Sequence, residues 1–519
     1  MYSDESLQRI EKISRMKNLW VIPYASKFDK KHSIADLIDK WSDNFRDVTE
    51  VIAWPKIEYS TAWRVILYRS FWKIAFAKLQ DATGEIQIMF SRESCKIITD
   101  WEAKADLTEE MSAFKFVEKL VDMGDFIGVK WELFVTHKWE LTLFAWEFEF
   151  LSKAIRPLPE KFHWLQDQEA IYRQRYLDLI RNNDSYERFL FRSNFVKAMR
   201  DFYHENSFIE IETPVFWSSA SWAAAAPFVT HHNDFDHDFF LRISPETSLK
   251  KATVWRFERV FEVAKDFRNE WSDPSHMQEF TMVEHYAVFW NFEDNMRFTE
   301  EMFDYIFKKL NLNKSVNIKD KNGELKEVNF EWPWERLDYV KWIKEASSID
   351  VETYEAWDED KLRSDIRSKW IEFEWMNKMW VTTLIDYLYK KVLRPKLIWP
   401  VIIYNYPKLM QPLARVSDKN QNMVEQFQVV VNGWEILKAY SELVDPLLQR
   451  ANFDEQAKAK AMWDVEATSG DDEFVLSMEY GMPPQSGWWM GIDRIITLLT
   501  GQDNLRDSVL FPLMKPEIK

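Results

Sequence analysis

A predicted hairpin near the middle of the chain combines residue types that could do chemistry. Arg268 and Glu270 are two residues apart, so an extended strand places both side chains on one face. On the second strand, alternation gives one face an aromatic ring, a carboxylate and a phenol, which are Phe280, Glu284 and Tyr286. A planar guanidinium suits binding and charge stabilisation at phosphate oxygens. By themselves, these residues fit a hairpin with a surface ion pair at least equally well.

A second group of residues, near the C-terminus, favours a functional interpretation. The run Gly487-Trp-Trp-Met-Gly-Ile-Asp-Arg494, the hairpin and the segment Phe208–Pro214 together resemble the three signature motifs of class II aminoacyl-tRNA synthetases. The closest resemblance is to the bacterial-type lysyl-tRNA synthetases. Further stretches similar to that family follow in its order, at residues 161–169, 172–180, 227–233, 411–415 and 510–515. The resemblance is specific because many separate motifs agree.

This resemblance implies an ATP-dependent ligase that attaches L-lysine to tRNA(Lys) through a lysyl-adenylate. The lysine carboxylate would attack the α-phosphorus of ATP and expel pyrophosphate, and the 3′-terminal hydroxyl of the tRNA would then attack the adenylate. Because negative charge builds up on phosphate oxygens, positioning and charge stabilisation would supply most of the catalysis. The family also implies Mg²⁺ as a cofactor and a homodimer with Pro214 near the subunit interface.

The same resemblance assigns the nucleotide-binding and catalytic residues. Arg268 would hold the α-phosphate and Arg494 the γ-phosphate, and both are expected to be catalytic. Phe280 would stack on one face of the adenine, with Arg494 on the other face. Glu270 and His276 would contact the adenine and the phosphates.

A pair of glutamates matches the magnesium ligands of the family. Glu435 and Glu442 are the predicted pair, and Glu435 belongs to the predicted ATP site as well. Magnesium prefers hard oxygen ligands and usually keeps waters beside one or two carboxylates. Seven residues of unbroken strand would separate the pair by about 23 Å, so a shared metal requires a bend. The alternative is a salt-bridged pair at the surface.

Substrate choice depends on the ε-ammonium of lysine, because a buried cation needs nearby carboxylates. Glu246 and Glu442 match the residues that read this group in the family, whereas the related aspartyl enzymes have an amide and a cation there. The lysine-binding positions implied by the resemblance are Trp222, Glu246, Glu284, Tyr286, Tyr440, Glu442 and Trp489. The chain departs from the family at Ala226, which replaces a basic residue, and at Lys438, which replaces an asparagine.

The composition suggests that many tryptophans occupy positions suited to glycine. The chain has 10 glycines and 27 tryptophans, and only their sum reaches the share of about 7% that glycine alone usually has. A stop codon reassigned to glycine would produce this pattern, and the alternative is a genuinely tryptophan-rich protein. Tryptophans stand at glycine positions of the family at Trp72, Trp131, Trp164, Trp222, Trp271, Trp434 and Trp489. Trp139 lies at a predicted hairpin tip, and Trp488 is a candidate for a genuine tryptophan.

The elements that must position these residues fall into two regions. Alternation predicts strands at 62–68, 73–80, 85–90, 126–136 and 140–150, with a helix at 107–123. Three strands, a helix and two strands is the order of the OB-fold β-barrel. Downstream, predicted strands at 208–214, 257–263, 280–286 and 427–431 mix with helices at 184–206, 292–310, 362–368, 383–392 and 494–499. Because strands and helices are not strictly interleaved, we expect an α+β fold with an antiparallel sheet flanked by helices.

Four regions follow from this pattern. We expect a helical segment at 1–45, an OB-fold anticodon-binding domain at 46–152, a junction containing prolines at 153–182 and a class II catalytic domain at 183–519. Within the OB fold, Arg69, Phe76 and Gln87 resemble the anticodon-reading residues. A base stacked on Phe76 would contribute about 1–3 kcal/mol. The alternative for Phe76 is a place in the barrel core.

The composition argues against several other classes of protein. A single cysteine, Cys95, rules out a disulfide scaffold and a multi-cysteine zinc site. No run of eighteen apolar residues predicts a membrane span, and no signal peptide is recognisable, so the expected location is the cytoplasm. A net charge of −17 does not decide about nucleic acid, because local patches do. Neither Rossmann, P-loop nor hydrolase-elbow motifs occur.

Two alternatives to an active lysyl-tRNA synthetase stay open at this point. A relative that lysylates a protein instead of tRNA would lack the OB fold. A catalytically inactive tRNA-binding protein would follow if Trp222, Trp271 and Trp489 are genuine. An indole at 222 or 489 would fill the lysine–ATP pocket, where a working enzyme needs close backbone approach.

Overall fold

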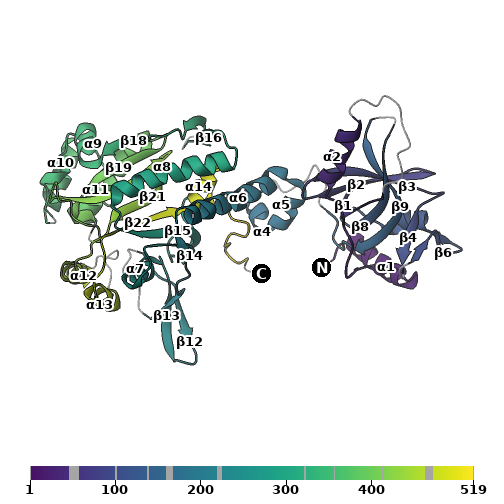
Figure 1. The fold of residues 1–519 in the computed structure, drawn as a ribbon, viewed down its shortest axis with the longest axis horizontal. Coiled ribbons are helices and arrows are strands. Elements are labelled where there is room, and N and C mark those ends of the chain that lie inside the picture. The colour runs from purple at the N-terminus through teal and green to yellow at the C-terminus, as the bar shows by residue number, and fades with distance from the viewer. Residues whose placement is uncertain are drawn as a thin grey trace. The chain divides into compact units, whose positions relative to one another are not determined.

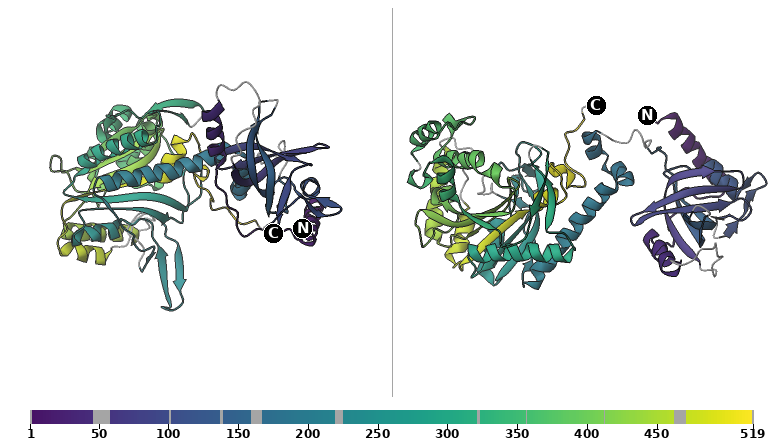
Figure 2. Two further views of the ribbon diagram at one scale, coloured as in Figure 1. Left: turned by 45° about the vertical axis from the view of Figure 1, so that its right-hand side comes forward. Right: turned by 90° about the horizontal axis from the view of Figure 1, so that it is seen from above.

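The computed structural model describes residues 2–45, 58–99, 102–136, 139–158, 167–218, 225–320, 323–355, 357–411, 413–461 and 471–517. The chain divides into two units, Met1–Gln166 and Asp167–Lys519 (Figure 1, Figure 2). This division lies within the junction expected at 153–182. The second half of that junction forms two short helices of the second unit, α4 (Gln168–Arg173) and α5 (Arg175–Arg181).

The first unit is built on a closed five-stranded barrel. Its strands follow the order β3-β2-β1-β8-β9, and a parallel pairing between β9 and β3 closes the ring. The barrel strands are β1 (Tyr59–Ser70), β2 (Ile74–Asp81), β3 (Gly84–Ser91), β8 (Phe126–Val135) and β9 (Leu141–Ser152). Alternate residues of β2 are buried, as the period of a strand requires for a filled barrel. The predicted OB-like barrel is confirmed.

Helices and short strands complete this unit. Helices α1 (Asp4–Asn18) and α2 (Ile34–Phe45) contribute Met16, Ile34 and Leu37 to the barrel core, so the first 45 residues pack on the barrel. The helix predicted at 107–123 is shorter, because the two-stranded ribbon of β6 (Asp106–Thr108) and β7 (Met111–Ser112) precedes α3 (Ala113–Leu120). Strands β4 (Lys96–Thr99) and β5 (Glu102–Lys104) extend the sheet beyond β9.

An eight-stranded sheet organises the second unit, in the order β10-β14-β15-β22-β21-β20-β19-β18. All neighbours are antiparallel except the two edge pairs, β10 with β14 and β18 with β19. The strands are β10 (Ile209–Glu210), β14 (Arg259–Phe267), β15 (Glu279–Val288), β18 (Glu335–Asp338), β19 (Val401–Pro407), β20 (Met423–Val431), β21 (Trp434–Ser441) and β22 (Gln485–Gly491). The predicted antiparallel sheet is confirmed. The strand predicted at 208–214 is only two residues long, and Pro214 lacks the N–H needed to continue pairing.

Helices cover both faces of this sheet (Figure 1). On one face the core contains residues of α6 (Asn183–Glu205), α8 (Phe292–Lys309) and α14 (Ile492–Leu499). On the other face, α9 (Tyr339–Ser347), α10 (Glu359–Ser368) and α11 (Val381–Val392) pack near β19 and β20. Helix α7 (Glu246–Trp255) packs on this second face at β14 and β15. The second face, between α7 and the α9–α11 group, carries the predicted lysine-binding residues Glu284, Tyr286, Tyr440 and Trp489.

Smaller elements surround the sheet. A three-stranded sheet consists of β11 (Phe216–Trp217), β12 (Val229–His232) and β13 (His237–Leu241), and β16 (Ser315–Lys319) pairs with β17 (Leu325–Asn329). Helices α12 (Pro446–Ala461) and α13 (Asp472–Glu479) follow β21. Within the described ranges, no helix is both long and apolar enough to span a bilayer.

Candidate active site

Two rows of side chains cross the second face of the eight-stranded sheet. The strand register aligns residues of β14, β15, β22 and β21 in one row, which are Glu262, Glu284, Trp489 and Lys438. The neighbouring row contains Val260, Tyr286, Gly487 and Tyr440. Four of the predicted lysine-binding residues therefore share one surface, although they come from three separate strands.

The carboxylates of Glu246 and Glu442 meet in this region. Glu246 is the first residue of α7, and Glu442 directly follows β21. Both carboxylates lie 2.5 Å from the same nitrogen, the Nζ of Lys250, one turn further along α7. The Tyr440 hydroxyl also donates a 2.6 Å hydrogen bond to Glu246. The fold thus brings together the two acids that were predicted to read an ammonium group, and it places an ammonium between them.

Aromatic rings complete the surroundings of this nitrogen. The ring centroids of Tyr286, Tyr440 and Phe474 each lie 5.6 Å from Lys250 Nζ. An ammonium within about 6 Å of a ring centroid is attracted by the electrons of the ring face. Burial disfavours the charge on Lys250, but the attraction of Glu246 and Glu442 outweighs it and raises the pKa of the amine. These groups therefore surround one ammonium, that of Lys250, and they are called the ammonium receptor from here on, together with Glu284.

A third buried carboxylate belongs to the same region. Glu284 accepts a 2.6 Å hydrogen bond from the Tyr286 hydroxyl and a 3.0 Å bond from Ser244 Oγ. Both donors are neutral. Burial raises the pKa of Glu284 well above its usual value, and the negative charge of Glu246 adds to this effect. Burial likewise raises the pKa of Glu442, against the attraction of Lys250.

The predicted nucleotide-binding residues form a second group. The guanidinium of Arg268 lies over the Phe280 ring, 5.1 Å from its centroid. Arg494 Nη1 donates to the backbone oxygen of Glu435 at 2.9 Å, and its Nη2 lies 3.4 Å from Nε2 of His276. Two guanidinium groups and an aromatic ring are suited to binding a base and its phosphates. The carboxylate of Glu270, by contrast, is on an exposed residue, and its backbone oxygen accepts from Gln278.

Two buried acids near the site were missing from the predicted set. Asp493 accepts a 2.7 Å hydrogen bond from the backbone N–H of Thr281 and lies 2.5 Å from Arg192 of α6, so it ties the start of α14 to β15 beside Arg494. Asp266 is fully buried 3.4 Å from Arg242, and burial raises its pKa to about 7. Their partners are distant in the sequence, so local spacing gives no signal for either acid.

Lys250 was missing as well, although a signal for it exists. Glu246 and Lys250 are four residues apart, a spacing that brings side chains together on a helix. Such a pair is common on the exposed faces of helices, where it contributes little to the stability of the fold. Only the fold shows that this pair is buried against Glu442.

The sequence comparisons agree with this geometry. Residues 167–515 match the family model of the class II tRNA synthetases of the D, K and N type. The lysine–tRNA ligase of Carboxydothermus hydrogenoformans is 36% identical over 98% of this chain and 97% of its own length. That of Helicobacter hepaticus is 38% identical over 98% and 94%, and that of Aquifex aeolicus 39% over 89% and 73%. The chain belongs to the lysine–tRNA ligase family of class II tRNA synthetases.

Membership of this family raises the question of a magnesium site. Glu435 is the better candidate ligand, because it lies beside Arg494 among the nucleotide-binding residues. The carboxylate of Glu442 is instead ion-paired with Lys250. A bulge at Ile436 bends β21 just after Glu435, but the described residues contain no cluster of three metal-binding side chains. The predicted pair of Glu435 and Glu442 therefore stays a prediction, with the bulge at Ile436 as the bend that a shared metal would require.

Two neighbouring positions of β22 show how closely the chain approaches the ammonium receptor. A Cβ atom on Gly487 would lie 2.3 Å from an oxygen of Glu442 and 2.5 Å from the Tyr286 ring, so only glycine fits. Trp489, two residues further on the same face, is flanked by Glu284 and Lys438. Trp489 thus belongs to the same strand as Gly487, whose backbone lies against Glu442 and Tyr286. Trp222 lies outside the described residues.

In the barrel unit, the predicted anticodon-reading residues share one surface. Arg69 of β1 is opposite Phe76 of β2, and Gln87 of β3 lies two positions from the partner of Phe76. Ala75 and Ala77 are buried in the barrel, whereas Phe76 is half-buried on the outer side. The alternative that Phe76 belongs to the barrel core is therefore not supported.

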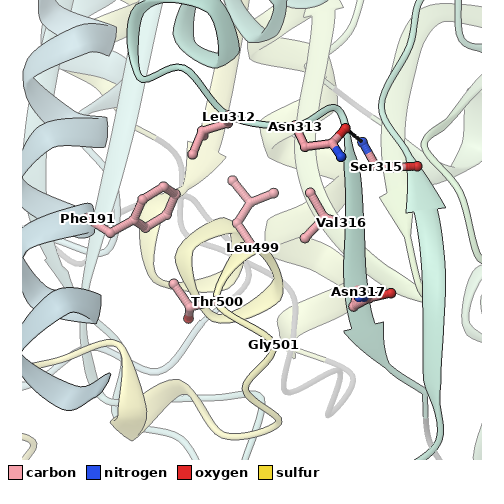
Figure 3. A pocket seen from close by; sticks show the side chains of 9 residues that line it. All are labelled: Phe191, Leu312, Asn313, Ser315, Val316, Asn317, Leu499, Thr500 and Gly501. Atoms are coloured by element: carbon pink, nitrogen blue, oxygen red, sulfur yellow. Dashed lines mark hydrogen bonds between the residues drawn. The ribbon is translucent and has the colours of Figure 1, made fainter. Parts of the chain in front are cut away.

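A separate pocket lies away from the site residues, between α6, β16 and α14 (Figure 3). Its volume is about 380 Å³. None of the nine side chains that line it is ionisable, and none of them belongs to the predicted site. The pocket therefore lacks the charged groups that the sheet face provides.

Proposed function

We propose that the chain attaches L-lysine to tRNA(Lys) in two ATP-dependent steps. One observation carries this proposal: two carboxylates that are distant in the sequence, those of Glu246 and Glu442, converge on a single ammonium. Buried carboxylates around a cation favour lysine over aspartate or asparagine as the amino acid. Relatives that match almost the full length of the chain are named lysine–tRNA ligases, which supports the same choice.

In the first step, an oxygen of the lysine carboxylate forms a bond to the α-phosphorus of ATP while the bond to pyrophosphate breaks. Arg268 and Arg494 stabilise the charge on the phosphate oxygens, and Phe280 supports the adenine ring. Glu246, Glu284, Glu442 and the tyrosines Tyr286 and Tyr440 hold the amino groups of lysine. In the second step, a terminal hydroxyl of the tRNA attacks the carbonyl carbon, and AMP leaves.

Mg²⁺ would accompany the ATP, with Glu435 as its protein ligand. When bound, the ion neutralises part of the phosphate charge. Arg69, Phe76 and Gln87 would contact the anticodon. A homodimer with Pro214 near its interface, and a cytoplasmic location, are further expectations that rest on the family resemblance. Light scattering on the purified chain tests the dimer.

We further propose that many tryptophan positions carry glycine in the source organism. Four tryptophans have positive φ angles of 60–62°, which glycine adopts far more easily. They are Trp20, Trp139, Trp370 and Trp375. Trp271 and Trp370 are 94% and 96% exposed, although tryptophan is usually among the more buried residues. Trp488 differs, because it is buried and donates a 2.9 Å hydrogen bond to Thr299, as expected for a genuine tryptophan.

Aminoacylation of tRNA(Lys) with labelled lysine tests the function, and peptide mass spectrometry of the native protein tests the decoding. We expect lysyl-tRNA to form with the glycine-bearing chain, and glycine masses at positions 271, 370 and 489. If the native protein has tryptophan at positions 271 and 489 and forms no lysyl-tRNA, the inactive tRNA-binding alternative would be favoured.

A further inference from the structure

The ammonium receptor contains more negative than positive side chains. Three carboxylates are at most 5% exposed, those of Glu246, Glu284 and Glu442, and Lys250 is the cation that pairs with two of them. Lys438 is also buried on this face, where its Nζ donates to Gln411, and its charge is attracted first by Glu435 and then by Glu246. With Glu435 set against Lys438, the described part of the receptor has three acids for one ammonium.

This surplus matches the charges of free lysine. An uncompensated buried carboxylate is costly and takes up a proton when no cation is near, so an ammonium group that enters beside it restores its charge and gains an ion pair. Lysine supplies two ammonium groups, and its carboxylate would lie towards Arg268. Glu284 has only neutral hydrogen-bond donors, Ser244 and Tyr286, and thus has room for a charged partner.

We propose that Lys250 is a positioning and specificity-determining residue, a built-in counter-ion that aligns Glu246 and Glu442 and sets the receptor to accept two further ammonium groups. This inference rests on the proposed function. The position of Lys250 on α7 fixes the geometry, since its helix also provides Glu246, and the three rings of Tyr286, Tyr440 and Phe474 confine its ammonium. One oxygen of Glu442 pairs with Lys250, while the other faces the backbone of Gly487.

The test compares Lys250→Met with Lys251→Met in the full chain. At each tryptophan position, this chain carries the residue, tryptophan or glycine, that mass spectrometry finds in the native protein. Methionine keeps most of the side-chain length and removes the charge. Lys251 is the matched control, because it lies next on the same helix and pairs with Glu473 outside the receptor. KM values for lysine and for ATP are measured by lysine-dependent ATP–pyrophosphate exchange.

We expect Lys250→Met to raise the KM for lysine at least about tenfold, because a buried ion-pair network loses its cation, and to change the KM for ATP less than about threefold. Lys251→Met is expected to match the wild type. Lys250→Arg keeps the charge but not the geometry. Its KM for lysine should therefore lie between that of the wild type and that of Lys250→Met. If Lys250→Met is unstable, an unchanged or lower KM for lysine in Lys250→Arg overturns the inference.

Three results would count against the assigned role. An unchanged or lower KM for lysine in Lys250→Met would mean that Lys250 is no positioning residue or competes with the substrate. Equal rises in both KM values would indicate a general structural role. A wild-type chain that shows no exchange with lysine would instead overturn the proposed function, so the two failures are distinguishable.

Discussion

At the scale of single residues, Glu246 is the side chain whose loss should separate lysine binding from ATP binding. Its carboxylate forms an ion pair with Lys250 and accepts a hydrogen bond from Tyr440. Neither of these contacts involves Arg268 or Arg494. We expect Glu246→Gln to raise the KM for lysine at least about tenfold, since removing one partner of a buried pair is costly. The KM for ATP should change less than about threefold.

The control for this variant is Glu258→Gln, which makes the same change at an exposed residue just after α7. Steady-state exchange kinetics with each substrate varied in turn provide both constants. Equal losses for lysine and ATP in Glu246→Gln would contradict the role assigned to this carboxylate.

Asp266 predicts a dependence of stability on pH. Burial raises its pKa in the folded chain to about 7, from 3.8. Between these values the folded state holds a proton that the unfolded state has lost, so stability falls as pH rises from about 4 to about 7. At about 1.36 kcal/mol per pKa unit, the loss is roughly 4 kcal/mol. Asp266→Asn removes the titration, so it should be more stable than the wild type at pH 8 and similar to it at pH 4.

Urea unfolding at both pH values measures this difference. An Asp266→Asn chain that is less stable than the wild type at pH 8 would show that the ionised carboxylate is held favourably by Arg242. The predicted gain in unfolding free energy at pH 8 would then be a loss, and the prediction would be wrong.

At the scale of elements, the ends of two helices test the glycine proposal. Trp20 and Trp370 occupy the left-handed position after α1 and α10, with φ of 60°. The backbone bonds from Val21 to Met16 and from Ile371 to Ile366 form the Schellman pattern, which usually has glycine at this position. We expect Trp370→Gly to raise the unfolding free energy of the tryptophan-bearing chain by about 1 kcal/mol.

Trp488→Gly is the matched control for this prediction. Its indole is 1% exposed and stacks on His285, so we expect a loss of about 3–5 kcal/mol. Denaturant unfolding of both variants gives the comparison. A destabilised Trp370→Gly chain would contradict glycine decoding at that position.

The sequence predicts well those elements whose pattern is local. The barrel strands follow from alternation, and α8 follows from helical spacing, to which the structure adds a cap at Asn291. Elements fixed by distant partners are harder to predict. Strand β10 has only two residues and exists because it pairs with β14. The shortened α3 depends on a two-stranded ribbon whose strands have at most three residues.

The candidate site shows the same limit. Family motifs identify Glu246 and Glu442, but the nitrogen on which they converge comes from Lys250, whose spacing is typical of a surface pair. The partners of Asp493 lie on α6 and β15, far away in the sequence. Local spacing does not contain such long-range contacts, so they could not be predicted from it.

At the scale of the whole molecule, we expect the second unit to form the adenylate by itself and the barrel unit to contribute only to the tRNA-dependent step. The second unit has its own hydrophobic cores and all the residues of the ammonium receptor. We expect a chain of residues 167–519 to keep lysine-dependent exchange within about tenfold of the full chain. Charging of tRNA should fall at least about 100-fold, because stacking of bases on the barrel contributes about 1–3 kcal/mol each.

Aminoacylation and exchange assays on the same preparations separate these two effects. A folded 167–519 chain that charges tRNA as well as the full chain would remove the proposed role of Arg69, Phe76 and Gln87. A fragment that folds but loses exchange would show that the barrel unit is needed for the chemistry.

The most direct measurement for the whole account is ATP–pyrophosphate exchange by the glycine-bearing full chain with a panel of single amino acids. Exchange reports the first step alone, without tRNA. The convergence of Glu246 and Glu442 on an ammonium predicts exchange with lysine and none above background with aspartate or asparagine. Exchange that depends on aspartate, or no exchange with any amino acid, would contradict it.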